Sequence, residues 1–257
     1  MDAFFNGVNG IQLLILIISA ILIGINKTGM PGIGVLPVIM LSIFFPAKYS
    51  TGLQLIMLCM ADFMAMLYYR RKGNLKLVCK ILPCALIGLG AGSLCLKFLG
   101  DNEGGLKVVI AVIILSLSIL NYWRLHYLKV DALPESFLFA SIVGIFAGVT
   151  TQIANAAGPV MAVYLLALRL PKDEYMGTSV WCFFILNLIK LPIFIWEGRI
   201  TYQAFRTDLS MLPFILIGAI IGIFFVRKVP QKLFNSVIEV LVLVSGIKLL
   251  YDGIMLL

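Results

Sequence analysis

The chain has 257 residues, of which 61% are apolar and 12% are charged, and its formal net charge is +8. A soluble domain carries about 25% charged residues, so this composition excludes an ordinary soluble enzyme. A membrane-spanning helix needs about 20 apolar residues, so the chain accommodates about eight to ten transmembrane elements and no soluble domain. We therefore expect an all-α polytopic protein embedded in a lipid bilayer.

The charged and metal-ligating residues argue against three other classes of protein. The basic residues lie in short connections between apolar segments, which is typical of cytoplasmic loops and not of nucleic-acid binding. The five cysteines form no CxxC pair and the single histidine, His126, lies in a charged connection. We expect no metal or other cofactor, because metal sites need several such ligands. One histidine cannot form an HExxH site, and we expect no enzyme activity.

The apolar segments fall into two sets of five. The first set is predicted at residues 11–25, 32–45, 52–69, 77–97 and 106–123. The second set is predicted at residues 136–150, 156–169, 177–196, 209–226 and 233–254. The polar connection from Arg124 to Glu135 separates the sets. We divide the single transmembrane domain into a first membrane repeat, residues 1–125, and a second, residues 130–257.

The first two segments of each set are short, and a polar break separates them. The breaks cover Ile25 to Gly32 in the first half and Thr150 to Asn155 in the second. Such interruptions of apolar segments predict a broken-helix hairpin at the start of each half. The sequence leaves open whether each hairpin is re-entrant or made of two full crossings.

The glycines of the two halves recur at nearly constant offsets, which indicates an internal duplication. Offsets of 124, 125 and 130 residues match Gly24 with Gly148, Gly34 with Gly158, Gly52 with Gly177, Gly73 with Gly198, and the GxxxG pair Gly88/Gly92 with Gly218/Gly222. Each half has an odd number of crossings, so the second begins on the opposite side of the membrane. The sequence therefore predicts two inverted repeats.

The distribution of Lys and Arg orients the predicted topology. The connections assigned to the inner side contain twelve of these residues, or eleven without Lys27, and those assigned to the outer side contain five. Basic residues are enriched in cytoplasmic loops. We therefore predict that both termini lie outside.

Paired broken helices in inverted repeats are typical of secondary transporters, whose sites lie near the membrane midplane. Irregular backbone at that depth faces protein or a water-filled cavity, and a helix that begins there directs N–H groups and a positive dipole end into it. Helices starting near Gly32 and Ala156 favour a small anion. The predicted binding residues at the two breaks are Lys27, Thr28, Gly29, Gly32, Thr151, Asn155 and Gly158. The alternative is that they only cap and pack two kinked helices.

Three polar residues lie inside the predicted helices. Asp62 and Lys190 lie at compatible depths, and Asn187 is one turn from Lys190 and matches Asp62 in the repeat. Such residues are costly in lipid and normally face the bundle interior. They either pair with one another or line the substrate path, and we include Asn187 and Lys190 among the predicted binding residues. Asp62 is the candidate for coupling to protons or sodium, with a structural role as its alternative.

Two charged residues in the last segment bear on the oligomeric state. Glu239 and Lys248 either extend to the membrane surface or face a partner subunit. The sequence leaves a homodimer open.

Residues at both predicted hairpins resemble the TauE/SafE sulfite exporter family, also called the 4-toluene sulfonate uptake permease family. The likeness is carried by residues 26–34 and 155–159, with support from Tyr164-Leu165-Leu166, Pro171-Lys172, Gly177-Thr178, Asn187 to Lys190 and Glu197 to Ile200. The family is associated with transport of sulfite, sulfonates and other small anions, usually at the bacterial cytoplasmic membrane. The resemblance implies a multi-pass transporter of sulfite or an organosulfonate in that membrane.

We expect a secondary transporter that exports its anion by alternating access around the two hairpins. With the inside negative, outward movement of one negative charge gains about 2.3 kcal/mol per 100 mV, so export needs no coupling ion. The first alternative is uptake of a small organic anion, which would require coupling to protons or sodium. The second is an anion channel.

Overall fold

The computed structural model describes residues 9–99 apart from positions 32 and 46, residues 136–256, and isolated positions between 104 and 119. The described residues are helical without strands, and six of their helices are long and apolar enough to span a membrane. The all-α membrane architecture is therefore confirmed. The predicted segment 106–123 and the connection 124–135, with His126, lie outside the described residues except for those isolated positions.

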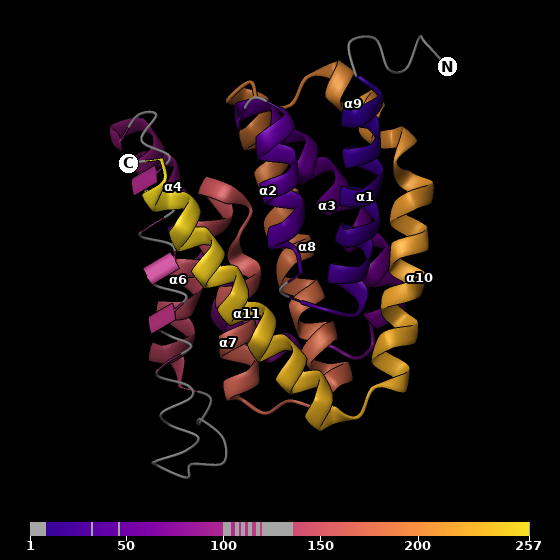
Figure 1. Ribbon diagram of the computed structural model, residues 1–257. Helices are drawn as coiled ribbons and strands as arrows, with labels where there is room; N and C mark the ends of the chain where they lie inside the picture. The colour runs from indigo at the N-terminus through magenta and orange to yellow at the C-terminus, as the bar shows by residue number, and fades with distance from the viewer. Residues whose placement is uncertain are drawn as a thin grey trace.

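The helices follow the predicted segments in chain order (Figure 1). The first half contains α1 (Gly10–Thr28), α2 (Val35–Phe44), α3 (Ala47–Tyr69) and α4 (Leu75–Leu99). The second half contains α6 (Phe137–Ala154), α7 (Ala157–Ala167), α8 (Lys172–Trp196), α9 (Tyr202–Ser210), α10 (Leu212–Lys228) and α11 (Gln231–Ile254). Of these, α9 is the helix that the apolar pattern does not predict.

The first two helices form a hairpin that returns to the end of the bundle where it begins. The side chain of Gln12, near the start of α1, donates a hydrogen bond to the carbonyl of Phe44 at the end of α2, at 3.1 Å. The helix α2 has 10 residues and is about 15 Å long, too short to cross a membrane. Inside the bundle, the Asn26 side chain accepts the Gly34 N–H at 3.0 Å and closes the turn.

The irregular backbone at both hairpins is shorter than predicted. The helix α1 continues through Thr28, and α6 continues through Ala154, so Thr150 and Thr151 are helical. The hydroxyl of Thr150 donates to the carbonyl of Phe146 at 2.8 Å, within its own helix. A threonine that bonds back to the preceding turn fits a helix interior, so its polarity alone does not mark a break.

Two helix pairs pack so closely that their backbones are in contact, and each pair has one helix from each half. The helix α1 runs parallel to α10, and α6 runs parallel to α4 (Figure 1). A Cβ atom on Gly218 would lie 2.1 Å from the carbonyl oxygen of Ile21, and one on Gly88 would lie 2.1 Å from that of Ile145. The predicted repeat matches Gly88 with Gly218 and Ile21 with Ile145. The GxxxG glycines thus lie at close helix contacts, where a larger residue has no room.

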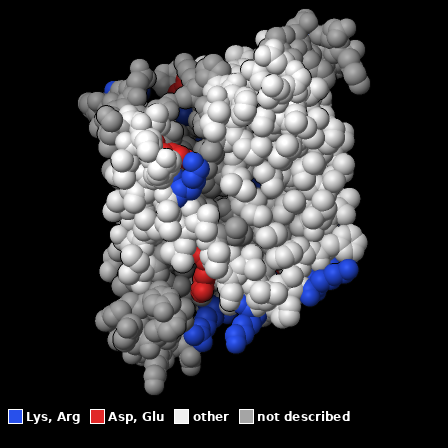
Figure 2. Space-filling view, in the orientation of Figure 1, with Lys and Arg blue, Asp and Glu red and all other residues white. Residues whose placement is uncertain are grey.

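Three connections that contain or directly follow basic residues meet at one end of the bundle, which we name the basic end. They are residues 70–74, 168–171 and 229–230. Lys72 pairs with Asp173 at 2.9 Å, and the Lys172 ammonium donates to the carbonyls of Val226 and Val229 at 2.6 Å each. Figure 2 shows Lys and Arg gathered at this lower end, below a broad uncharged face. The start of α1 and the end of α11 lie at the opposite end (Figure 1).

Candidate functional site

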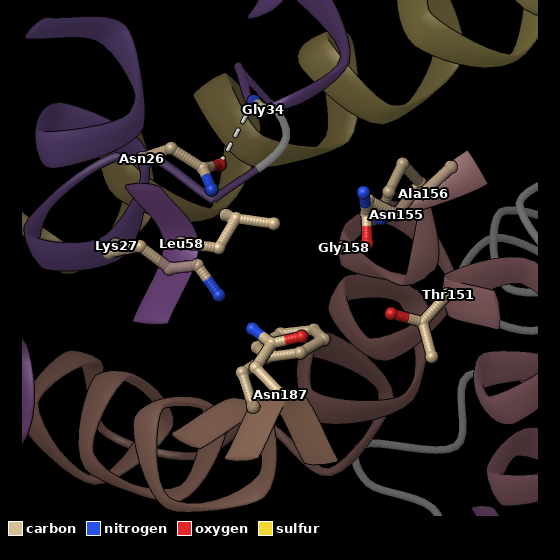
Figure 3. A pocket seen from close by; sticks show the side chains of 11 residues that line it. Asn26, Lys27, Gly34, Leu58, Thr151, Asn155, Ala156, Gly158 and Asn187 are labelled. Carbon is tan, nitrogen blue, oxygen red and sulfur yellow. Dashed lines mark hydrogen bonds between the residues drawn. The ribbon is translucent and has the colours of Figure 1, made fainter. Parts of the chain in front are cut away.

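A cavity of about 30 Å³ lies where the two hairpins approach α3 and α8. That volume has room for about two water molecules. Its lining consists of Asn26, Lys27, Gly34, Leu58, Thr151, Asn155, Ala156, Gly158, Pro159, Phe183 and Asn187. Asn26 and Lys27 approach it from the first hairpin, Thr151 and Asn155 from the second, and Asn187 from α8 (Figure 3).

The first wall of the cavity contains a buried ion pair. The Lys27 ammonium lies 2.7 Å from one carboxylate oxygen of Asp62, and the Asn187 side-chain amide donates to the other at 2.6 Å. The ammonium also lies over the Phe183 ring, 4.3 Å from its centroid, which stabilises a cation. The charge of Lys27 is thus neutralised by Asp62. The sequence did not predict this pair.

The second wall contains a buried cation whose hydrogen-bond partners are neutral. Lys190 is fully buried, and its ammonium donates to the Thr151 carbonyl at 2.9 Å, the Thr151 hydroxyl at 3.0 Å and the Asn155 side-chain oxygen at 2.5 Å. These three bonds use all its donors. The acceptors lie at the C-terminal end of α6, where the helix dipole favours a cation.

The buried charges beside the cavity therefore do not cancel. Among the described residues, Lys190 forms no ion pair with a carboxylate, whereas Lys27 and Asp62 neutralise each other. When Lys190 carries its proton, two ammonium groups and one carboxylate leave one net positive charge beside the cavity.

The break in the second hairpin depends on Asn155. Its backbone adopts the left-handed conformation with φ of 52°, which asparagine tolerates better than most residues. Its side-chain amide donates to the Thr51 carbonyl at 3.1 Å and to the Gln54 side chain at 3.2 Å, both on α3. With its oxygen accepting from Lys190, Asn155 joins the end of α6 to α3 and α8.

Two helices begin at the cavity. The helix α2 starts after Gly34, and α7 starts after Ala156, and both residues line the cavity. Gly158, in the first turn of α7, also lines it, and a Cβ atom built there would meet nothing within 4 Å. The first N–H groups of a helix carry partial positive charge. The helix starts and the net charge thus both favour an anion in the cavity.

A second ion pair lies between the cavity wall and the end of α8. Arg199 pairs with Glu197 at 2.7 Å, and Glu197 accepts a hydrogen bond at 3.3 Å from Gln152, which follows Thr151 on α6. Burial lowers the pKa of the Arg199 guanidinium, and the Glu197 carboxylate opposes this shift. The connection after α8 is thereby tied to the helix that carries Thr151.

The comparison with known families agrees with this architecture. The family model for sulfite exporter TauE/SafE matches residues 15–249, which include both hairpins, α3 and α8. The chain belongs to the TauE/SafE sulfite exporter family. No curated protein and no solved structure matches the chain significantly. The resemblance at residues 26–34 and 155–159 is confirmed, and the chain is a multi-pass membrane protein of a family that transports sulfite- and sulfonate-type anions.

Most of the predicted binding residues of this TauE/SafE protein gather at the cavity. Those that line it are Lys27, Thr151, Asn155, Gly158 and Asn187. Lys190 lies directly behind the second wall and donates to two of these residues. Gly32 lies outside the described residues.

Thr28 and Gly29 lie away from the cavity, contrary to their predicted place in the site. The Thr28 hydroxyl donates to the Ala219 carbonyl on α10 at 2.8 Å, and a Cβ atom on Gly29 would lie 2.2 Å from the carbonyl oxygen of Gly222. Because α1 is helical through Thr28, consecutive residues point about 100° apart, so Lys27 faces the cavity and Thr28 faces α10. The packing of α1 against α10 accounts for both residues.

Sequence reasoning missed several residues that line the cavity of this sulfite exporter homologue. Asn26 lies within the first break, and Gly34, Ala156 and Pro159 lie within four residues after a break. Their positions beside predicted site residues were the available signal. Leu58 and Phe183 had no such signal, because an apolar residue facing a cavity has the same local sequence as one facing the core.

Proposed function

We propose that this protein is a secondary transporter that exports sulfite or an organosulfonate by alternating access around the cavity between the two hairpins. The observation that carries the proposal is the net positive charge left by Lys27, Lys190 and Asp62 at the cavity. The starts of α2 and α7 add partial positive charge. Membership in the TauE/SafE family supports the class of substrate.

The size of the cavity favours a carrier over an open channel. The cavity has room for about two water molecules, which is a local pocket rather than a continuous water-filled path through the bundle. Release of an anion to either side must therefore open a path to it. Such a cycle of closed and open states is that of a carrier.

We infer that residues 1–125 and residues 130–257 form two inverted repeats. The helix α1 runs toward the basic end, whereas its match α6 runs away from it (Figure 1). The pairing of α1 with α10 has its counterpart in the pairing of α6 with α4. Two such halves provide the two related conformations that alternating access requires.

We further propose that the protein lies in the bacterial cytoplasmic membrane with the basic end inside. Basic residues favour the cytoplasmic side, and the start of α1 and the end of α11 would then lie outside. The membrane potential, negative inside, would drive the anion outward.

Cysteine labelling in intact cells tests this orientation. In a cysteine-free background, Tyr202→Cys should react with a membrane-impermeant reagent, because Tyr202 is 77% exposed at the end opposite the basic end. Arg71→Cys, in the exposed connection after α3, should react only after the cells are permeabilised. The reverse labelling pattern would place the basic end outside and remove the electrical argument for export.

Replacing Gly158 with alanine should reduce anion flux without destabilising the fold. The added methyl group would lie in open space within the cavity, and alanine favours a helix over glycine by roughly 0.5–1 kcal/mol. The measurement is saturable flux and counterflow of sulfite, thiosulfate, taurine, isethionate, sulfoacetate and lactate in liposomes.

The matched control is Gly90→Ala. Gly90 is an exposed helical glycine of α4 whose Cβ position also meets nothing within 4 Å, but it lies away from the cavity. We expect its flux to equal that of the wild type. Equal flux in Gly158→Ala would show that substrate does not use this cavity, and unitary conductance in the wild type would identify a channel.

A further inference from the structure

The short helix α9 contains a carboxyl group that is fully buried and unpaired. Asp208 has 0% exposure, and neither carboxyl oxygen has a hydrogen-bond partner among the described residues. The hydroxyl of Thr207 is buried without a partner in the same part of the chain. The start of α9 does not require Asp208, because Thr201 caps it by accepting the Ala204 N–H at 3.1 Å.

The helix α9 turns Thr207 and Asp208 inward and its large apolar residues outward. Its buried residues are Ala204, Thr207 and Asp208, which follow helical spacing. Its exposed large apolar residues are Tyr202, Phe205 and Leu209. In a bilayer this arrangement turns the apolar residues toward lipid and places the carboxyl of Asp208 in the bundle interior. An ionisable side chain kept inside a membrane protein points to a function.

No cation faces Asp208 among the described side chains of the helices that pack against α9. On α3, the neighbouring titratable group is the phenol of Tyr49, which is neutral near physiological pH. On α10, the basic residues Arg227 and Lys228 lie in the last turn, at the basic end. On α9 itself, Arg206 extends over an aromatic ring four residues earlier, at 5.9 Å. The Lys48 side chain on α3 lies outside the described residues. Among the described side chains the carboxylate would have no donor and no cation, which is unfavourable, so the packed carboxyl carries a proton.

Asp208 lies next to the bend between α9 and α10, and α10 in turn contacts the helix α1 that reaches the cavity. The helices α9 and α10 meet at an angle of 51°, whereas α4, which matches α10 in the repeat, is continuous. The helix α10 packs along α1, and the Thr28 hydroxyl bonds to the Ala219 carbonyl between them. Lys27, the residue before Thr28, lines the cavity. A movement of α9 can therefore reach the cavity through α10 and α1.

We propose that Asp208 is a proton-binding site through which the pH at the end opposite the basic end controls anion transport. The carboxyl O–H bond is intact while α9 packs against α3. When the bend opens and water reaches the carboxyl, this bond breaks and the proton passes to water at the end opposite the basic end. The carboxylate then keeps α9 open until a proton returns. Asp62 is not available for this role in the described packing, because Lys27 and Asn187 hold both of its oxygens.

Proton binding at Asp208 depends only on how α9 packs. The effect of this proton on transport rests on the anion transport proposed above. Infrared spectroscopy of the full chain in lipid tests the binding alone. We expect the carbonyl band of a protonated carboxyl in the wild type at neutral pH and its loss in Asp208→Asn. The control Asp173→Asn, which removes an exposed carboxyl paired with Lys72, should retain the band.

Two infrared outcomes would overturn the assignment of a proton to Asp208. One is a wild-type band that persists unchanged in Asp208→Asn. The other is a band that disappears when sodium replaces choline at constant pH, which would assign a sodium ion to the carboxylate instead.

Anion flux in liposomes with an imposed pH gradient tests the coupling. We expect the imposed pH difference to change the initial rate of wild-type anion flux by about tenfold, within the usual range of coupling between sites. Asp208→Asn should keep anion counterflow and lose this response, and Asp208→Glu, which retains a carboxyl, should keep part of it. A response that persists in Asp208→Asn, or a wild type that moves anion with no response, would overturn the coupling. A wild type that moves no anion while its infrared band is present would refute the proposed function and leave the proton site standing.

Discussion

Replacing Lys190 with methionine should weaken anion binding by about 10- to 100-fold. Opposite unit charges about 6–10 Å apart attract each other by about 2–3 kcal/mol at an effective dielectric constant of about 20, and Lys190 supplies the charge that no carboxylate neutralises at the cavity. Methionine has a similar length and fills the space, but Thr151 and Asn155 lose their bonds to the ammonium, so binding is measured on material shown to be folded. The anion concentration at half-maximal flux in liposomes measures the effect.

The control for Lys190→Met is Lys72→Met, which removes an equal charge at the basic end. The Lys72 side chain is 37% exposed and pairs with a surface carboxylate, so its loss should change anion affinity little. If Lys190→Met bound anion as tightly as the wild type in folded material, the net charge of the buried residues would not determine the selectivity for anions.

Removing one partner of the Lys27–Asp62 pair should lower the free energy of unfolding by about 3–5 kcal/mol. The remaining charge would stay buried without its partner, since Lys27 and Asp62 are 6% and 0% exposed. We expect Lys27→Met and Asp62→Asn each to show this loss. The double variant should lose much less than the sum, because it removes both charges. Unfolding of the purified variants by denaturant measures all three values.

Additive losses in the double variant would show that the two side chains do not stabilise each other. A transport measurement on Asp62→Asn tests the coupling role that the sequence left open for Asp62. That role would be supported by a well-folded Asp62→Asn protein that keeps anion exchange and loses accumulation driven by a proton or sodium gradient. The ion pair observed with Lys27 favours the structural role.

The sequence predicts the features that depend on local composition. Interruptions such as Thr28-Gly29 or Asn155 are conspicuous within apolar segments, so both hairpins and much of the cavity wall could be found. The match of Asp62 with Asn187 in the repeat also anticipates their direct hydrogen bond, since matched positions of α3 and α8 meet where the two halves pack.

The features that depend on helix rotation and packing could not be predicted. Whether Lys27 or Thr28 faces the cavity depends on how far α1 continues as a helix, which the residues around the break do not determine. The pairing of Lys27 with Asp62 depends on the approach of α1 to α3. The helix α9 was missed because Arg206 and Asp208 interrupt its apolar pattern, although Thr201 is a recognisable N-cap.

The pairing of α1 with α10 determines the order in which the protein can be assembled. These helices touch through residues separated by 191 positions, such as Thr28 and Ala219. The first helix therefore enters the membrane long before its partner has been synthesised, with Asn26 and Lys27 still lacking their final neighbours. Contacts so distant in sequence form late and slow folding. The helix α1 is thus made well before α10 but reaches its place only with it, and until then it depends on lipid or on insertion factors to shield its polar end.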